Sequence, residues 1–181
     1  MEAVTFCPAN RQEWRQWLQE NHENAASVWL VYYKKKANRA TLSWSEAVDE
    51  ALCFGWIDST ARPIDEEKFM QFFTKRKAGS AWSKINKEKV KRLTAAGLMM
   101  PAGRKCIALA RKNGSWSILD EVEALKIPDD LEKAFKARRG SKAYFTGLSR
   151  SVQKTYLQKL VLAKRPETRL KRIQEIVNLG E

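Results

Sequence analysis

The sequence predicts an α+β fold, in which a small antiparallel sheet of about three strands with N-terminal helices precedes an all-helical C-terminal part. Runs rich in β-branched and aromatic residues, typical of strands, all lie within residues 27–74. Beyond residue 80 the apolar residues recur only at helical spacing. A chain of 181 residues is long enough for one large domain or two small ones. Segregation of strands and helices is the mark of the α+β class.

The N-terminal elements follow from apolar spacing and capping residues. Residues 11–22 are predicted to be a helix, because Trp14, Trp17 and Leu18 form an apolar stripe at i, i+3 and i+4. Residues 27–33 read as a strand. Ser43 has a glutamate three residues later, which predicts a capping box at the start of the next helix, and Gly55 is expected to end that helix.

The next two strands are predicted at residues 56–62 and 68–74, joined by a turn into an antiparallel pair. The later helices are expected at 84–96, 101–113, 129–137, 152–164 and 167–179. We therefore expect an α+β domain at 1–97, a helix and linker at 98–127, and a C-terminal helical segment at 128–181.

The charge is distributed unevenly along the chain. The net charge is +13, yet residues 1–67 hold 7 Lys/Arg and 11 Asp/Glu, a net of −4, which leaves +17 for residues 68–181. Such a basic half favours nucleic acid, another anionic ligand or an acidic protein surface as the partner. A well-solvated helical surface is the alternative interpretation.

Several classes of protein are disfavoured. No apolar run is long enough to span a bilayer, and the N-terminus resembles no export signal. Three widely spaced cysteines favour reduced thiols, so a cytoplasmic location is expected. No cluster has metal-ligand spacing, and no cofactor motif is present, so neither a metal nor a cofactor is expected.

The junction at residues 46–59 is the first candidate site. Cys53 falls at a helix C-terminus, where the helix dipole raises a thiol pKa, so a structural thiol is favoured over a nucleophile. Asp58 lies two residues into an apolar strand beside Trp56, so it must be paired or face a cleft. Arg62, at i+4, is expected on the same strand face. A ligand-facing Asp58 and a structural ion pair both remain open.

The basic turn and following helix form the second candidate. Lys84, Lys87 and Lys91 share one helix face and could follow a nucleic-acid backbone, with Trp82 as a stacking platform. The alternative is a solvated face with Trp82 in the core. The candidate ligand-binding set is Trp56, Asp58, Arg62, Lys75, Arg76, Trp82, Ser83, Lys84, Asn86, Lys87 and Lys91.

The last helix carries the third candidate, a row of arginines at Arg165, Arg169 and Arg172. Guanidinium groups in a row can clamp phosphates or carboxylates. They can equally pair with acids of the N-terminal half and dock the two segments together.

Four strings together resemble one family: EALCFGWIDS at 50–59, FTKRKAGSAWSKIN at 73–86, AGLMMPAG at 96–103 and LAKRPETRLKRI at 162–173. In this order they are similar to the YdeI/OmpD-associated (bacteriocin-protection) proteins. The resemblance implies protection against cationic antimicrobial peptides and an association with an outer-membrane porin, without an established reaction. A chain at +13 would repel a cationic peptide, so direct sequestration is disfavoured.

Three functions are consistent with the sequence. The first is a cytosolic binding protein that acts in envelope stress or antimicrobial protection through an anionic partner. The second is a small-molecule or enzymatic site around Asp58 and the turn at 82–86. The third is a structural adaptor. No catalytic motif is recognisable, so a non-enzyme is favoured.

Overall fold

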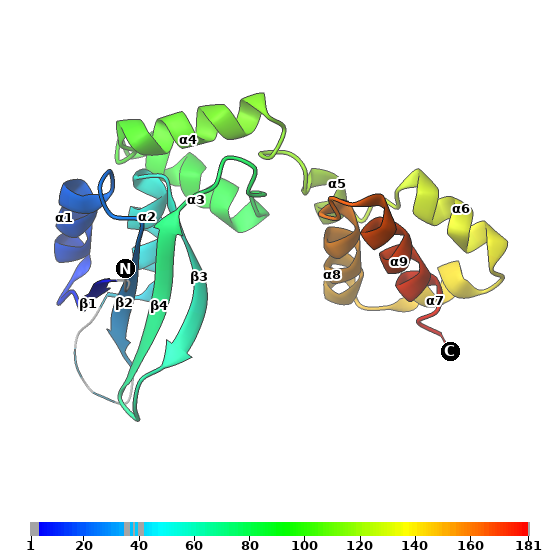
Figure 1. Ribbon diagram of the computed structural model, residues 1–181, viewed down its shortest axis with the longest axis horizontal. Helices are drawn as coiled ribbons and strands as arrows, with labels where there is room; N and C mark the ends of the chain where they lie inside the picture. The colour runs from blue at the N-terminus through cyan, green and yellow to red at the C-terminus, as the bar shows by residue number, and fades with distance from the viewer. Residues whose placement is uncertain (1–3, 35–36, 38, 40–41, 181) are drawn as a thin grey trace. The chain divides into compact units, whose positions relative to one another are not determined.

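The computed structural model describes residues 4–34, 37, 39 and 42–180, which form two compact units. The first unit runs from Met1 to Trp116 and the second from Ser117 to Glu181. The expected helix-and-linker segment at 98–127 is thus divided between the units. The first unit combines a small sheet with helices and the second is helical, which confirms the predicted α+β class (Figure 1).

The sheet has four strands among the described residues, in the order β1-β2-β4-β3. The antiparallel strands are β2 (Ser27–Tyr33), β4 (Lys68–Lys75) and β3 (Trp56–Pro63), as the sequence predicts. The additional strand, β1 (Val4–Phe6), pairs parallel to β2 and makes the sheet mixed. Three residues are too few for an alternating pattern, which is why sequence inspection misses this edge strand.

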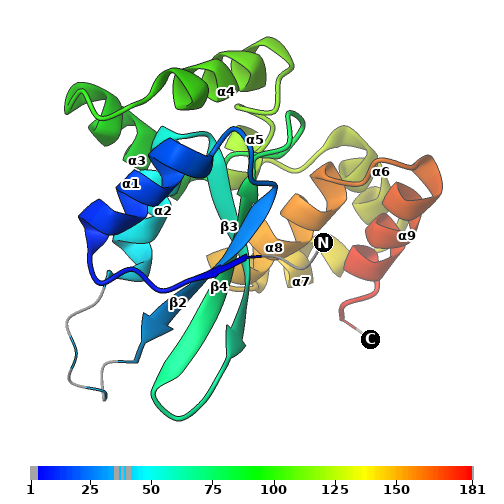
Figure 2. The ribbon, with the colours of Figure 1, turned by 60° about the vertical axis from the view of Figure 1, so that its left-hand side comes forward.

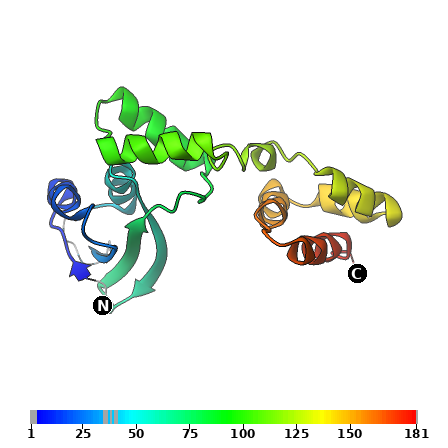
Figure 3. The same cartoon turned by 45° about the horizontal axis from the view of Figure 1, so that its top comes forward.

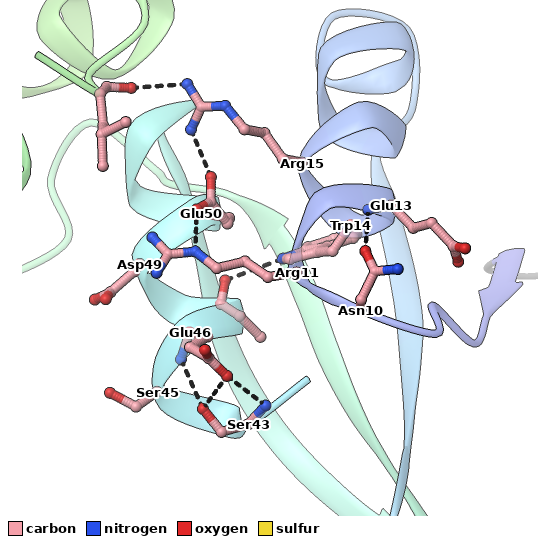
Figure 4. A network of polar contacts seen from close by, with 12 residues as sticks. Asn10, Arg11, Glu13, Trp14, Arg15, Ser43, Ser45, Glu46, Asp49 and Glu50 are labelled. Atoms are coloured by element: carbon pink, nitrogen blue, oxygen red, sulfur yellow. Dashed lines mark hydrogen bonds and ion pairs between the residues drawn. The ribbon is translucent and has the colours of Figure 1, made fainter. Parts of the chain in front are cut away.

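Helices α1 (Arg11–Asn21) and α2 (Trp44–Cys53) pack on one face of the sheet (Figures 1 and 2). Trp14 is fully buried, and its indole N–H donates to the Ala47 carbonyl at 3.0 Å. The predicted capping box at Ser43 is present, with the hydroxyl and the N3 glutamate bonding reciprocally (Figure 4). The core therefore lies between this sheet face and the two helices.

A buried carboxylate joins α1 to α2. Glu50 is 2% exposed and accepts hydrogen bonds from Arg11 Nε and Arg15 Nη1, each at 2.5 Å (Figure 4). The second terminal nitrogen of Arg15 donates to the Leu98 carbonyl at 3.0 Å. Because a buried charge is tolerated only when it is paired, this network fixes the position of α1 on α2.

Helices α3 (Lys84–Ala95) and α4 (Pro101–Lys112) pack against α2. The approach of α4 is very close: a Cβ atom at Gly103 would lie 2.2 Å from the Cys53 carbonyl oxygen. The Met100 N–H also donates to that oxygen at 3.1 Å. Glycine at 103 therefore sets the distance between α4 and the end of α2.

The second unit is built from short helices around its own core (Figure 3). Phe135 and Phe145 lie 5.5 Å apart between ring centroids, and Leu157 is also fully buried. Sequence inspection misses α5 and α7, which are short and lack a long periodic pattern. The helices are α5 (Asp120–Glu123), α6 (Asp129–Ala137), α7 (Ser141–Gly147), α8 (Arg150–Val161) and α9 (Pro166–Val177).

Candidate anion-binding groove

Helix α3 has three distinct faces. Val90 and Leu93 are buried in the core of the first unit. Lys89 and Arg92 point to α2, where they bind the two carboxylate oxygens of Asp49 at 2.7 and 2.5 Å. The third face carries the basic stripe predicted from the sequence, which consists of Lys84, Lys87 and Lys91.

The contacts of Asp49 separate the two cationic faces of α3. Burial by itself would raise the pKa of Asp49, but the hydrogen bonds from Lys89 and Arg92 lower that pKa below its ordinary value. The carboxylate is therefore ionised and compensates the charges on its side of the helix. Asp49 therefore binds Lys89 and Arg92, and the basic stripe lies on a different face of α3.

The basic stripe forms one wall of a groove of about 660 Å³, which we call the α3–α4 groove. Arg111, from the end of α4, and Trp116, from the segment after it, supply further lining. The complete lining consists of Lys84, Lys87, Glu88, Val90, Lys91, Thr94, Ala95, Arg111 and Trp116.

Trp116 is the aromatic surface of this groove. The Lys87 ammonium lies 5.7 Å from the centroid of the Trp116 ring, and the Arg111 guanidinium carbon lies 5.1 Å from it. The ring also contacts Trp82, with centroids 5.0 Å apart. The face of an indole ring has negative electrostatic potential and attracts cations. These contacts therefore hold the Lys87 and Arg111 side chains beside the Trp116 ring.

The predicted stacking platform is wrong. Trp82 is 1% exposed and belongs to the core, which is the alternative that the sequence left open. Trp116 takes its place in the groove, and sequence inspection did not single out Trp116 or Arg111. One pattern in the sequence could have indicated Trp116: this indole comes shortly after two basic residues, 111 and 112, and a turn at Gly114.

The groove combines four cations with one carboxylate and with apolar wall atoms. The carboxylate is Glu88, which lies 3.9 Å from Lys84 in an exposed i, i+4 pair. Such an exposed pair contributes little and is screened by salt, so Glu88 neutralises little of the Lys84 charge. The basic stripe extends over about 10 Å of helix axis. This arrangement suits a ligand with several negative charges and flat rings.

Asp58 and Arg62 both lie on strand β3, but on opposite faces of the sheet. A bulge lies between them, because Asp58 pairs with Phe73 whereas the next register pair is Ala61 with Gln71. The extra residue reverses the side-chain alternation, so Asp58 faces the helices and Arg62 faces the opposite side of the sheet. The expectation that both share one strand face is therefore wrong.

Each of these side chains has its own partners. Asp58 Oδ2 accepts hydrogen bonds from Trp44 Nε1 at 2.9 Å and from Gln71 Nε2 at 3.0 Å. The Arg62 guanidinium lies over the Trp29 ring, 5.0 Å from its centroid. Asp58 thus serves as an acceptor that ties β3 to α2 and β4, and it lies outside the α3–α4 groove.

Trp56 and Cys53 are core residues. Both are fully buried, and the Trp56 indole N–H donates to the His22 carbonyl at 3.3 Å. Burial raises the pKa of Cys53 to about 11, despite the nearby Arg15. A thiol with that pKa is protonated at neutral pH, which fits a structural role.

The remaining residues of the predicted set have local partners. Ser83 is the N-cap of α3 and accepts from the Asn86 backbone N–H at 3.2 Å. The Lys75 ammonium donates to the Glu23 carbonyl at 2.5 Å. Arg76 turns inward and stacks on Trp82. Of the predicted set, the structure brings only the basic stripe together in this groove.

The arginines of α9 are engaged within their own unit. Arg169 binds Asp130 of α6 through two hydrogen bonds, Nε to Oδ2 at 2.5 Å and Nη2 to Oδ1 at 2.9 Å. Arg172 donates to the Lys159 carbonyl, and Arg165 is the N-cap position of α9. The partner of Arg169 is therefore not an acid of residues 1–67, and the proposed docking of the two segments does not use it.

Two negative findings concern the described part of the chain. It contains no group of three metal-ligating side chains close enough to share an ion. None of its helices has both the length and the apolar character needed to cross a membrane.

Two family models match the chain. Residues 6–106 match a domain of unknown function (DUF8412), which covers more than half of the sequence and includes the strings at 50–59, 73–86 and 96–103. Residues 124–179 match the family described as bacteriocin-protection, YdeI or OmpD-associated, which includes the string at 162–173. This second match confirms the resemblance predicted from the sequence. No curated protein and no solved structure matches the chain.

Proposed function

We propose that this chain, which belongs to the domain family of unknown function DUF8412 and carries a C-terminal YdeI- or OmpD-associated segment, is a binding protein for single-stranded nucleic acid. The α3–α4 groove is the proposed binding site. Lys84, Lys87, Lys91 and Arg111 would contact phosphates, and Trp116 would stack on a base.

One observation carries the proposal, namely the placement of four cations around a partly exposed indole in a single groove. In a nucleic acid the phosphates would bind the cations. The bases would stack on the indole ring, because every base has a flat π-face. An acidic protein surface would use the cations but not the indole. Single-stranded nucleic acid uses both.

The proposal also bears on protection against bacteriocins, which the description of the C-terminal family names. A chain of net charge +13 repels cationic peptides, so capture of such a peptide is disfavoured. We therefore infer that any protective role acts through the bound anionic partner.

The first prediction tests the groove by charge reversal. We expect the triple variant Lys84→Glu, Lys87→Glu and Lys91→Glu to lose most of its affinity for a labelled single-stranded oligonucleotide in fluorescence anisotropy. Each lost phosphate contact should reduce the slope of log K against log salt by about 0.7. Trp116→Ala should weaken binding by about 1–3 kcal/mol for one stacked base, and Trp116→Phe should retain most of it.

A matched control separates the groove from net charge alone. The triple variant Lys136→Glu, Lys164→Glu and Lys171→Glu changes the same number of exposed lysines in the second unit. It should bind nearly as well as the unchanged protein. Equal losses in the two triple variants, or affinity that does not respond to salt, would refute the assignment of the groove.

A further inference from the structure

A second cavity lies in the first unit, at the end of the sheet where β4 leaves toward α3. Its volume is about 460 Å³, within the range of small-molecule sites, and we call it the sheet-end pocket. Its walls are largely apolar, with Ala102 and Leu109 contributing accessible carbon surface and the buried Phe54 and Trp56 bordering the pocket. It shares no lining residue with the α3–α4 groove.

Arg76 gives this pocket its chemistry. One terminal nitrogen, Nη2, donates to the Ala81 carbonyl, and the guanidinium carbon lies 3.8 Å from the centroid of the Trp82 ring. The other two nitrogens, Nε and Nη1, are buried and have no hydrogen-bond partner. A buried donor without an acceptor is destabilising, and a charged donor more so, so the arrangement calls for an acceptor.

Among the described residues, no carboxylate is hydrogen-bonded to this guanidinium. Burial lowers the pKa of Arg76 to about 10, although Cys106 and Asp58 act in the opposite direction. The other charged residues that line the pocket are Lys75 and Lys105, both cations, together with Glu23, whose side chain is 81% exposed. The pocket therefore has a surplus of positive charge next to apolar walls.

The backbone around Gly55 makes room for the pocket. Gly55 has a φ of +75°, and a Cβ atom there would lie 3.3 Å from both the Ala102 carbonyl oxygen and Cys106 Cβ. A side chain at this position would be strained and would meet α4. Glycine thus turns the chain from α2 into β3 and leaves this wall of the pocket open.

We propose that the sheet-end pocket binds a small organic acid, with its carboxylate at Arg76 and its apolar body against Ala102 and Leu109. A carboxylate is planar and satisfies guanidinium donors, with Lys75 and Lys105 adding to the attraction. The apolar walls favour an aromatic or aliphatic acid over inorganic phosphate, which has no carbon surface to bury. This site is separate from the nucleic-acid groove.

The second prediction tests the pocket with phenylacetate as the probe and the full chain as the protein. Isothermal titration calorimetry should show binding of phenylacetate. The neutral amide phenylacetamide should bind at least about tenfold more weakly, because it lacks the charge-assisted hydrogen bonds, and so should inorganic phosphate. Arg76→Gln should weaken phenylacetate binding by about tenfold to a hundredfold.

Two further variants keep the test independent of folding defects. Leu109→Trp retains Arg76 but fills the pocket from its rim, where Leu109 is 44% exposed, and it should abolish phenylacetate binding. Lys112→Gln, on the same helix but outside the pocket, should leave it unchanged. Circular dichroism verifies that each variant is folded.

The outcomes separate this proposal from that of the nucleic-acid groove. Oligonucleotide binding by Leu109→Trp should equal that of the unchanged protein, so either proposal can fail alone. Absence of phenylacetate binding, equal binding of the amide, preference for phosphate, or unaltered binding in a folded Arg76→Gln or Leu109→Trp variant would each overturn the inference.

Discussion

At the scale of single residues, two adjacent carboxylates connect α2 to the helices on either side of it. Asp49 and Glu50 are 4% and 2% exposed, yet they point in different directions because consecutive helix residues do not share a face. Asp49 binds the cations of α3, and Glu50 binds Arg11 and Arg15 of α1. Helix α2 is thereby fixed on two sides by charge as well as by packing.

The third prediction concerns Asp49 and pH. The pKa of Asp49 is lowered in the folded protein, so its contribution to the free energy of unfolding is fully present above about pH 4. That contribution is lost as the pH falls through the lowered pKa. Asp49→Asn should therefore destabilise the protein at neutral pH by about 3 kcal/mol, and the difference should shrink in acid.

Urea denaturation followed by circular dichroism at neutral and acidic pH measures this effect. Glu88→Gln is the control, because its carboxylate is exposed and makes only a long ion pair, so its loss should cost less than about 0.5 kcal/mol. If Asp49→Asn is as stable as the unchanged protein at neutral pH, the ion pairs of Asp49 make no net contribution to the free energy of unfolding, and the prediction is wrong.

At the scale of helices and strands, the packing of α4 on the end of α2 depends on one glycine. Gly103 brings the helix backbone to the Cys53 carbonyl, a contact that any larger residue would block. Helix α4 contributes to both binding surfaces, since it supplies Arg111 to the groove and Leu109 to the sheet-end pocket. A displacement of α4 would therefore change both surfaces.

The fourth prediction follows from that contact. Gly103→Ala places a Cβ atom 2.2 Å from the Cys53 carbonyl oxygen, so α4 must move and the protein should lose about 1–3 kcal/mol of stability. Gly79→Ala is the matched control, because no atom lies within 4 Å of its added Cβ. Thermal denaturation of both variants measures the difference. Equal melting temperatures would contradict the role assigned to Gly103.

The sequence predicts elements better than it predicts relations between them. Regular apolar spacing is a local property, so α1 to α4 and the three antiparallel strands could be predicted. The bulge between Asp58 and Ala61 depends on pairing with β4, which no local pattern records, and it separates Asp58 from Arg62. Trp116 enters the groove only because α4 folds back beside α3. Tertiary contacts of this kind are invisible in a single sequence.

The charge of the whole molecule is organised differently from the charge of its sequence halves. The acids of residues 1–67 do meet cations, but Asp49 meets those of α3 inside the first unit. Arg169 of α9 binds Asp130 of α6 inside the second unit. These ion pairs each lie within one unit, and the two family matches lie one in each unit.

The fifth prediction is that the units keep their properties separately. Phe145 is fully buried in the second unit, and Phe145→Ala should destabilise that unit by about 3–5 kcal/mol. Oligonucleotide binding by the groove should remain unchanged at temperatures where the second unit is unfolded, as circular dichroism and anisotropy together would show. Loss of oligonucleotide binding in step with unfolding of the second unit would contradict this separation.

The division at Trp116 has an optical consequence. All seven tryptophans and all three cysteines precede residue 117, whereas residues 117–181 contain tyrosine as their strongest chromophore. Intrinsic tryptophan emission and thiol labelling therefore report on the first unit alone, in the intact chain and without any engineered probe. Trp116, at the edge of that unit and in contact with Trp82, is positioned to respond to whatever occupies the groove.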